Sequence, residues 1–259
     1  MKLETMVYKK DNKVGRLTLS RPEALNAISP QLLADLQKVM DEVEGDQEVK
    51  ALVITGEGRA FSAGADLKHV LGFFDSPAAF AEYLKNFNGV MLRLEELPVV
   101  TLALVNGFAF AGGLELLLSC DLAIAAEDAT IGDQHINFAL TGGPVHIQLP
   151  RRIGAQRALE LILTGGWVTG KEAAARGLVL RAVPRDKLEE EAEKLLAQLR
   201  DKSRDAFAPI KRAVKRGLTM TLAEGFEYSG LQTLQYFNTS DKPKRGVQAF
   251  VDKKGPPKF

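Results

Sequence analysis

The stretch NGFAFAGGLE, Asn106 to Glu115, decides the fold because its glycine-bearing turn joins two apolar segments. The segment before it, Val99–Val105 (VVTLALV), is short and almost wholly apolar, which is typical of a strand buried on both faces. The segment after it, Leu114–Leu118, is apolar apart from Glu115 and belongs to a helix predicted to begin near Gly112. A buried strand, a tight turn and a buried helix form the basic unit of an α/β protein.

Further strands of this kind are predicted on both sides of that unit. Ala51–Gly56 (ALVITG) and Asp121–Ala126 are short apolar runs, and Val14–Leu19 alternates apolar with polar residues. Ser29 followed by Pro30 marks a helix start, because serine caps a first turn and proline fits its first position. Short buried strands separated by helices predict a largely parallel sheet with covered faces.

The pattern changes along the chain, and helical spacing of apolar residues dominates after about residue 151. One helix is predicted around Leu188–Leu199, and two more are predicted between residues 204 and 239. We therefore predict an α/β core over residues 1–200 and a helical region over residues 201–259.

The composition excludes several classes of protein. The 34 Lys and Arg nearly balance the 33 Asp and Glu, so no global positive field attracts nucleic acid or an anionic membrane. Cys120 is the single cysteine, so no intrachain disulfide forms. No apolar run approaches the roughly 20 residues of a membrane span, and the N-terminus lacks the apolar stretch of a secretory signal. A cytoplasmic enzyme without a nucleic-acid or membrane partner is expected.

Two glycine-bearing turns each follow a buried strand. They are Arg59–Lys68 (RAFSAGADLK) and Asn106–Glu115. In parallel sheets ligands bind beyond the carboxyl ends of strands, and small residues let a ligand approach the main chain. A helix that begins near Gly112 also offers free amides of positive partial charge. Together the turns suit an oxyanion hole, in which two N–H groups hold one oxygen; the alternative is that the glycines only permit tight turns.

Glu115 is the one carboxylate in the apolar helix that follows the second turn. Burying a carboxylate is costly unless it is paired or used. Two roles fit: a partner of the helix dipole, or a general acid or base beside the free amides. Burial would raise its pKa and the helix terminus would lower it.

Motifs along nearly the whole chain resemble the crotonase, or enoyl-CoA hydratase/isomerase, superfamily. They are RPEALNAIS, AFSAGADLK, NGFAFAGGLELLLSCDLAIAAEDA and AFVDKK, in family order. The resemblance implies an α/β fold with a crotonase-type spiral of ββα units as the core. It also implies a C-terminal helical region that builds trimers, often paired into hexamers.

The resemblance also implies where an acyl-CoA substrate binds. It assigns the oxyanion-hole amides to Ala65 and Gly112, and the first catalytic glutamate of hydratases to Glu115. Coenzyme A is part of the substrate, so neither a separate cofactor nor a metal is expected. The residues expected near CoA are Ala63, Asp66, Leu67 and Lys68 in the first turn, Ala24 and Leu25 beside the adenine, and Lys253 or Lys254 from a neighbouring subunit; each of these two lysines equally fits a solvated surface charge.

The sequence departs from hydratases at their second glutamate, which stands twenty residues after the first. That count leads from Glu115 to His135, and the loop Thr141–His146 that follows also differs. Histidine is mostly neutral near pH 7, yet it hydrogen-bonds water and carries protons. A hydrogen-bonded core histidine is the structural alternative.

The leading hypothesis is a hydratase-type lyase, in which Glu115 moves protons, His135 orients water, and Ala65 with Gly112 stabilises a thioester enolate. The alternative is a decarboxylase or hydrolase for a carboxylated acyl-CoA, because loss of the second glutamate removes a charge that repels a substrate carboxylate. A noncatalytic RNA-binding member is a third reading. This reading, which includes a scaffolding role, comes from the resemblance, because the superfamily contains an RNA-binding branch. Lys211–Arg216 is a local basic face, but such a run is more often a solvated helix face.

Overall fold

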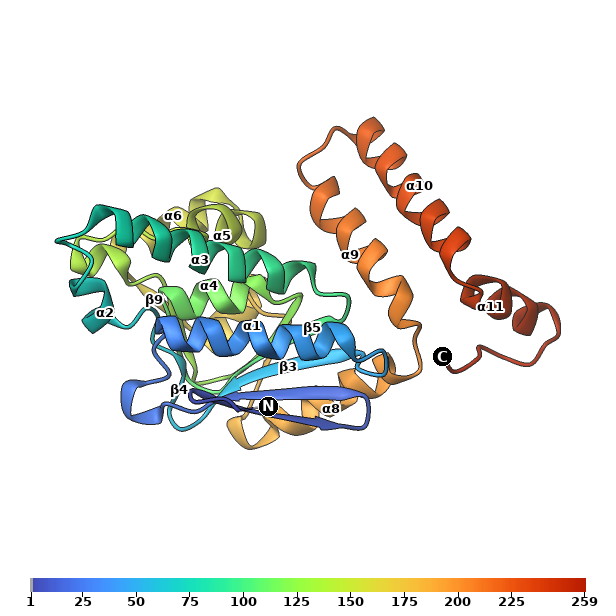
Figure 1. The fold of residues 1–259 in the computed structure, drawn as a ribbon, viewed down its shortest axis with the longest axis horizontal. Helices are drawn as coiled ribbons and strands as arrows, with labels where there is room; N and C mark the ends of the chain where they lie inside the picture. Colours follow the sequence, from blue (N-terminus) through green and yellow to red (C-terminus); the bar gives the residue numbers. More distant parts are fainter. Residues whose placement is uncertain (1) are drawn as a thin grey trace.

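The computed structural model describes residues 2–259 and contains two β-sheets with helices packed around them (Figure 1). The six-stranded sheet has the order β1-β2-β3-β5-β7-β10, and the four-stranded sheet has the order β4-β6-β8-β9. The larger sheet consists of β1 (Met6–Asp11), β2 (Val14–Leu19), β3 (Ala51–Gly56), β5 (Val100–Val105), β7 (Leu122–Ala126) and β10 (Arg181–Val183). The smaller sheet consists of β4 (Ala60–Ser62), β6 (Phe108–Phe110), β8 (Thr130–Gly132) and β9 (Trp167–Thr169).

Eleven α-helices and three 3-10 turns connect and cover the strands of the described chain. The helices of the core are α1 (Pro30–Gly45), α2 (Leu67–Leu71), α3 (Pro77–Glu96), α4 (Gly112–Ser119), α5 (Val145–Ile153), α6 (Ala155–Thr164), α7 (Gly170–Ala175) and α8 (Leu188–Arg200). The C-terminal helices are α9 (Arg204–Gly217), α10 (Leu222–Thr239) and α11 (Lys242–Val251). The 3-10 turns are η1 (Pro22–Ala24), η2 (His135–Phe138) and η3 (Arg185–Lys187).

The two sheets are built by a repeating ββα unit. In each of three consecutive units, β3-β4, β5-β6 and β7-β8, the first strand joins the large sheet and the second joins the small one before a helix follows. Pairs β3–β5, β5–β7, β4–β6 and β6–β8 are all parallel. The chain therefore winds as a spiral, which confirms the predicted α/β crotonase-type core.

Strand limits agree closely with the apolar runs in the sequence. Strands β2 and β3 begin and end at the predicted residues, and the Ser29 hydroxyl accepts the Leu32 amide as the predicted cap of α1. Val99 and Asp121, predicted as strand ends, lie just outside β5 and β7. Asp121 leaves the strand because its carboxylate accepts hydrogen bonds from Thr101 N and Oγ1.

Alternate residues of β3 face two different apolar layers. Leu52 and Ile54 belong to the main core, which includes residues of α1, α3 and α4. Val53 points the other way and packs with α8 residues such as Leu188 and Leu196. A strand covered on both faces must be apolar throughout, as this one is. Full burial of each Leu, Ile or Val side chain stabilises the folded state by roughly 1.5–3 kcal/mol.

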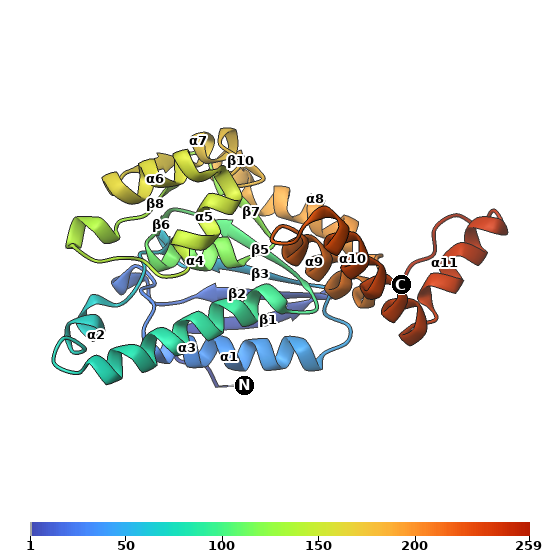
Figure 2. The same ribbon diagram turned by 90° about the horizontal axis from the view of Figure 1, so that it is seen from above.

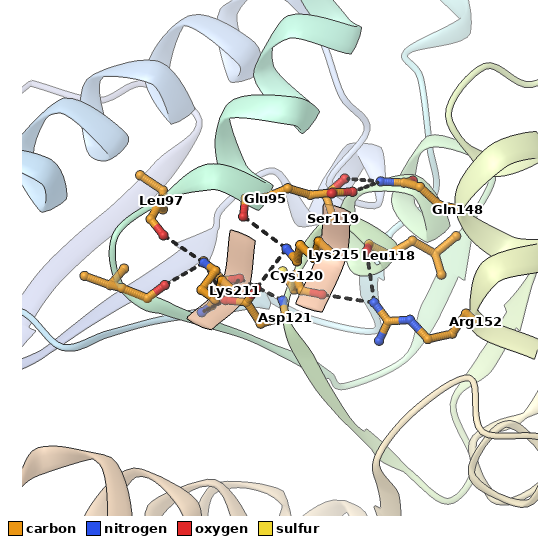
Figure 3. Close-up of polar contacts among 12 residues, drawn as sticks. Glu95, Leu97, Leu118, Ser119, Cys120, Asp121, Gln148, Arg152, Lys211 and Lys215 are labelled. Carbon is orange, nitrogen blue, oxygen red and sulfur yellow. Dashed lines mark hydrogen bonds and ion pairs between the residues drawn. The ribbon is translucent and has the colours of Figure 1, made fainter. Parts of the chain in front are cut away.

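The C-terminal helices α9, α10 and α11 extend away from the sheets (Figures 1 and 2). Helix α9 is tied to the core by an ion-pair cluster around Asp121, where Lys211 Nζ lies 2.7 Å from Oδ2 and Lys215 Nζ lies 2.8 Å from Oδ1 (Figure 3). Lys211 also donates to the Leu97 and Val99 carbonyls at 2.8 Å. Both lysines of the basic run Lys211–Arg216 therefore hold α9 against the core. Within residues 2–259 no helix has both the length and the apolar character of a membrane span.

Candidate active site

A cavity of about 120 Å³ lies where the two glycine-bearing turns meet. The candidate residues Ala65, Gly112, Glu115 and His135 all line it. The turns come together because β4 and β6, which form their first parts, are adjacent parallel strands of the small sheet. Parallel strands end at the same edge, so the segments that follow them share one site.

The backbone amides of Ala65 and Gly112 lie close together at this cavity. A β-carbon on Gly112 would stand 3.2 Å from the Ala65 nitrogen and 3.4 Å from the Gly64 α-carbon. Gly112 is the first residue of α4, so its N–H has no acceptor within the helix. Neither amide donates a hydrogen bond to another group of the described chain. Two unused donors from distant segments therefore face one space.

The surrounding backbone holds the Ala65 turn in place. An isolated parallel bridge joins Ile28 to Ala65, with Ile28 N donating to Gly64 O at 2.7 Å and Asp66 N donating to Ile28 O at 3.0 Å. Gly64 has φ +100°, which favours glycine over other residues. Ala111, just before α4, has φ 49° and ψ −117°. Such backbone strain in a non-glycine residue is typical of functional sites.

Glu115 is buried in the first turn of α4, with 3% of its surface exposed. Its Oε1 accepts hydrogen bonds from Gly143 N at 3.0 Å and Val145 N at 3.1 Å. Its Oε2 has no partner among residues 2–259 and is left for the cavity. Burial raises the pKa of Glu115, and this effect outweighs the two amides and the nearby His135, which lower it. A carboxyl group of raised pKa is suited to exchange protons near neutral pH.

His135 lies at the start of η2 and faces the same cavity. Its Nδ1 is 2.5 Å from Oδ1 of Asp133, a carboxylate with only 1% of its side chain exposed. Burial lowers the pKa of His135, but the hydrogen bond and charge of Asp133 and the charge of Glu115 raise it overall. Asp133 is a residue of the site that was not predicted from the sequence. The sequence signal for Asp133 was its place two residues before the unexpected histidine, His135.

The residues expected around CoA are adjacent in the structure. Ala63 N donates to Leu25 O at 3.0 Å, which places the Ala24–Leu25 segment against the first turn. Asp66 caps α2 by accepting the Lys68 amide at 3.2 Å, and it pairs with Arg21 at 3.2 Å. Although burial raises the pKa of Asp66, Arg21 and the Lys68 amide lower it overall.

Three of the expected CoA residues have side chains at the surface. Leu67 and Lys68 are exposed where α2 begins, next to the first turn. Lys253 is also exposed, but it follows α11 at the end of the molecule opposite α2 (Figures 1 and 2). Lys253 therefore does not reach the site of its own subunit, and a contact with the site of a neighbour stays a prediction.

Aromatic residues of α3 form one wall of the cavity. Tyr83, Phe80 and Phe87 line it, and Phe73 packs behind Tyr83 with ring centroids 5.0 Å apart. Burial, followed by the charge of Glu115, raises the pKa of Tyr83 to about 12, so this hydroxyl is neutral. Phe74, which lies between α2 and α3, is exposed and does not line the cavity. The wall is bulky and largely apolar.

Sequence comparisons identify the family of this site and fold. The profile of the enoyl-CoA hydratase/isomerase family matches residues 9–259. The chain is 35% identical over 257 residues to a probable enoyl-CoA hydratase of Mycobacterium bovis, covering 99% of this chain and 98% of that protein. It is 37% identical over 257 residues to a probable enoyl-CoA hydratase of Rhizobium meliloti, covering 98% and 97%.

Solved structures agree with this assignment. A crystal structure of an enoyl-CoA hydratase from Bacillus anthracis has a TM-score of 0.90 at 31% identity, with 98% of each chain covered. An enoyl-CoA hydratase structure from Mycobacterium smegmatis has a TM-score of 0.89 at 30% identity, again with 98% of each chain covered. The chain belongs to the enoyl-CoA hydratase/isomerase family.

Proposed function

We propose that this protein is a hydratase-type lyase that adds water across the double bond of an α,β-unsaturated acyl-CoA. The observation that carries the proposal is the meeting of two unused amides, Ala65 N–H and Gly112 N–H, beside the buried carboxyl of Glu115. Two donors fixed on one oxygen take up the negative charge that develops on a thioester when a nucleophile adds to its β-carbon.

The roles of the side chains follow from their positions. Oε2 of Glu115 faces the cavity while Oε1 is held by two amides, so the carboxylate is oriented to take a proton from water. His135 lines the same cavity and holds that water. The hydroxyl adds to the β-carbon, and the electrons of the double bond move to the oxygen between Ala65 and Gly112. This chemistry uses only groups of the chain and the substrate, so the proposal requires no further cofactor.

A decarboxylase or hydrolase is the second candidate, because His135 replaces a glutamate that would repel a substrate carboxylate. Asp133 weakens this candidate. Its carboxylate lies directly against His135, so the pair together is close to neutral when the ring is protonated. Because Glu115 also faces the cavity, the cavity has no excess positive charge that would bind an acyl-chain carboxylate. The charge balance therefore favours hydration of an uncharged acyl chain.

The two candidates are separated by a substrate assay. We expect the protein to remove the conjugated enoyl absorbance of crotonyl-CoA and to form the 3-hydroxyacyl thioester. We expect no release of CO₂ from methylmalonyl- or glutaconyl-type thioesters. If CO₂ appears while crotonyl-CoA persists, hydration is the wrong reaction and the oxyanion hole serves decarboxylation.

We further propose that the C-terminal helices assemble copies of the chain into trimers. Every residue of α10 is at least partly exposed, and so is every residue of α11. Their large apolar side chains are bare in a single chain, and such a surface is typical of an interface. The large exposed apolar residues of α9, α10 and α11 are Ile210, Val214, Leu222, Phe226, Leu231, Leu234, Phe237, Val247, Phe250 and Val251.

The double substitution Phe226→Glu/Leu234→Glu should break the assembly, because it places charges on the apolar surface of α10. We expect light scattering coupled to gel filtration to give three or six chain masses for the wild type and a single chain mass for the variant. Val7→Glu, at an exposed apolar position on β1, is the control and should leave the mass unchanged. A wild type that already elutes as a monomer would contradict the proposal.

A further inference from the structure

We propose that Asp133 is a positioning residue that turns the histidine at position 135 into the proton donor of the site, with Nε2–H directed into the cavity opposite Glu115. This inference rests on the proposed hydration. It assigns a role to a residue that faces no substrate itself and acts only through the ring of His135. The pair Asp133–His135 then does the work of a second carboxyl group.

The position of Asp133 is fixed by the small sheet. It follows Gly132, the last residue of β8, which pairs with β6 at Phe110. The Gly132 carbonyl also accepts the amide of Ala111, the residue just before α4, at 3.1 Å. The end of β8 is thus bonded to the backbone that presents the Gly112 amide. A carboxylate anchored here keeps a constant distance from the oxyanion hole.

The hydrogen bond determines which ring nitrogen faces the cavity. Oδ1 of Asp133 accepts from Nδ1, which fixes a proton on that nitrogen. Nε2 has no partner among residues 2–259 and is free to act on a substrate. The space beside the ring is kept by Gly142, where a β-carbon would stand 3.0 Å from Nδ1 and only 2.4 Å from the Val145 side chain.

Burying the carboxylate of Asp133 costs folding free energy, which a purely structural role does not explain. It is buried, and its second oxygen, Oδ2, has no hydrogen-bond partner in the described chain. Buried polar atoms are normally paired, and an unpaired one costs free energy. A core histidine could be satisfied by a backbone carbonyl without this cost. A buried carboxylate, unlike a carbonyl, also stabilises a positive charge on the ring.

The charges around the ring favour its protonated form. The titratable groups that face His135 are Asp133, from the end of β8, and Glu115, from α4. Burial alone lowers the pKa of His135, and these two carboxylates reverse the direction, so the pKa lies above its usual value of 6.5. The two carboxylates therefore favour the imidazolium, and the ring loses its proton as the pH rises through this raised value.

The chemistry balances with this assignment. Glu115 takes one proton from water as the hydroxyl forms its bond to the β-carbon and the double bond opens to the enolate. The enolate collapses while Nε2 of His135 gives its proton to the α-carbon, which completes the addition of water. The ring is then neutral and Glu115 is protonated. Transfer of that proton back to the ring restores the starting state.

The test is Asp133→Asn in the full-length protein, read first by NMR of histidine labelled with ¹³C and ¹⁵N. The resonance is assigned with His135→Gln; His69 and His146 serve as internal references. In the wild type we expect His135 to titrate above 6.5 and its neutral form to carry the proton on Nδ1. In Asp133→Asn the pKa should fall below the wild-type value, because burial then dominates. Asp128→Asn, at an exposed acid, should change nothing.

The second readout is the pH profile of crotonyl-CoA hydration. In Asp133→Asn the alkaline limb of kcat/KM should move to lower pH, and kcat at pH 7.5 should fall by about 10–100-fold while KM changes little. A merely structural Asp133 would lower the amount of folded protein without moving the limb. If the variant does not fold, the wild-type NMR data decide: titration below 6.5, or a neutral form protonated on Nε2, overturns the inference.

The two readouts also separate this inference from the proposed function. A wild type that shows the expected titration of His135 but does not hydrate crotonyl-CoA keeps the Asp133–His135 pair and rejects the reaction. A wild type that hydrates crotonyl-CoA while His135 titrates identically in Asp133→Asn keeps the reaction and rejects the pair.

Discussion

Glu115→Gln should lower kcat for crotonyl-CoA hydration by about 10²–10⁴-fold, the usual contribution of a general acid or base. Glutamine has nearly the same shape, and its carbonyl oxygen can still accept the amides of Gly143 and Val145. It cannot take a proton from water. The substitution therefore removes proton transfer and leaves the cavity intact, so we expect KM to change by less than kcat.

The measurement is a steady-state assay of both kcat and KM, with circular dichroism to confirm folding. Glu96→Gln is the matched control, because Glu96 is exposed and, within residues 2–259, pairs only with Arg216 at 3.3 Å. It should leave kcat unchanged. In the wild type the acidic limb of the profile should lie above pH 4.5, since burial raises the pKa of Glu115 and activity falls as the pH drops through that value. A Glu115→Gln enzyme as active as the control refutes the assigned role.

Much of this fold is readable from the sequence because its strands are buried on both faces. Ala51–Gly56 is apolar throughout, and the sheet uses all six residues. Ser29 caps α1 by accepting the amide of Leu32, three residues further along the chain. Such a local contact can be predicted from the sequence. Where the signal is local and apolar, the predicted limits fall on the observed ones.

Elements without such a signal were not predicted. The edge strand β1 (Met6–Asp11) has one fully buried residue, so its apolar pattern is weak and its pairing with β2 defines it. The strands of the small sheet are three residues long, too short to show a period. Helix α11 (Lys242–Val251) has no fully buried residue and therefore no core-facing stripe.

The residues of the site also differ in how far the sequence predicts them. Ala65, Gly112 and Glu115 lie in turns with a recognisable glycine pattern, and the structure brings them to one cavity. Asp133 has no such pattern. It matters because its side chain meets His135 two residues later, at a point where the chain leaves β8. That contact depends on how the turn folds, and the spacing alone does not reveal it.

Gly112→Ala should lower kcat by about 10²–10³-fold, the typical cost of losing one donor of an oxyanion hole. The added β-carbon would stand 3.2 Å from the Ala65 nitrogen, in the space where the acyl oxygen must sit to reach both amides. Gly112 has no positive φ, so alanine fits the backbone. Alanine is also the better helix former, which offsets part of the tight contact in the free energy of unfolding.

Gly112→Ala is therefore expected to lower kcat strongly and to change the free energy of unfolding little. A glycine outside the site serves as the control. Gly89 lies within α3 with nothing within 4 Å of its would-be β-carbon. Gly89→Ala should therefore raise the free energy of unfolding by about 0.5–1 kcal/mol and leave kcat unchanged. If Gly112→Ala melts no lower than the wild type yet loses most of its kcat, the lost function is the amide pair. If Gly112→Ala keeps the wild-type kcat with crotonyl-CoA, the acyl oxygen does not bind between the Ala65 and Gly112 amides. The added methyl group would block a thioester oxygen from reaching both N–H groups.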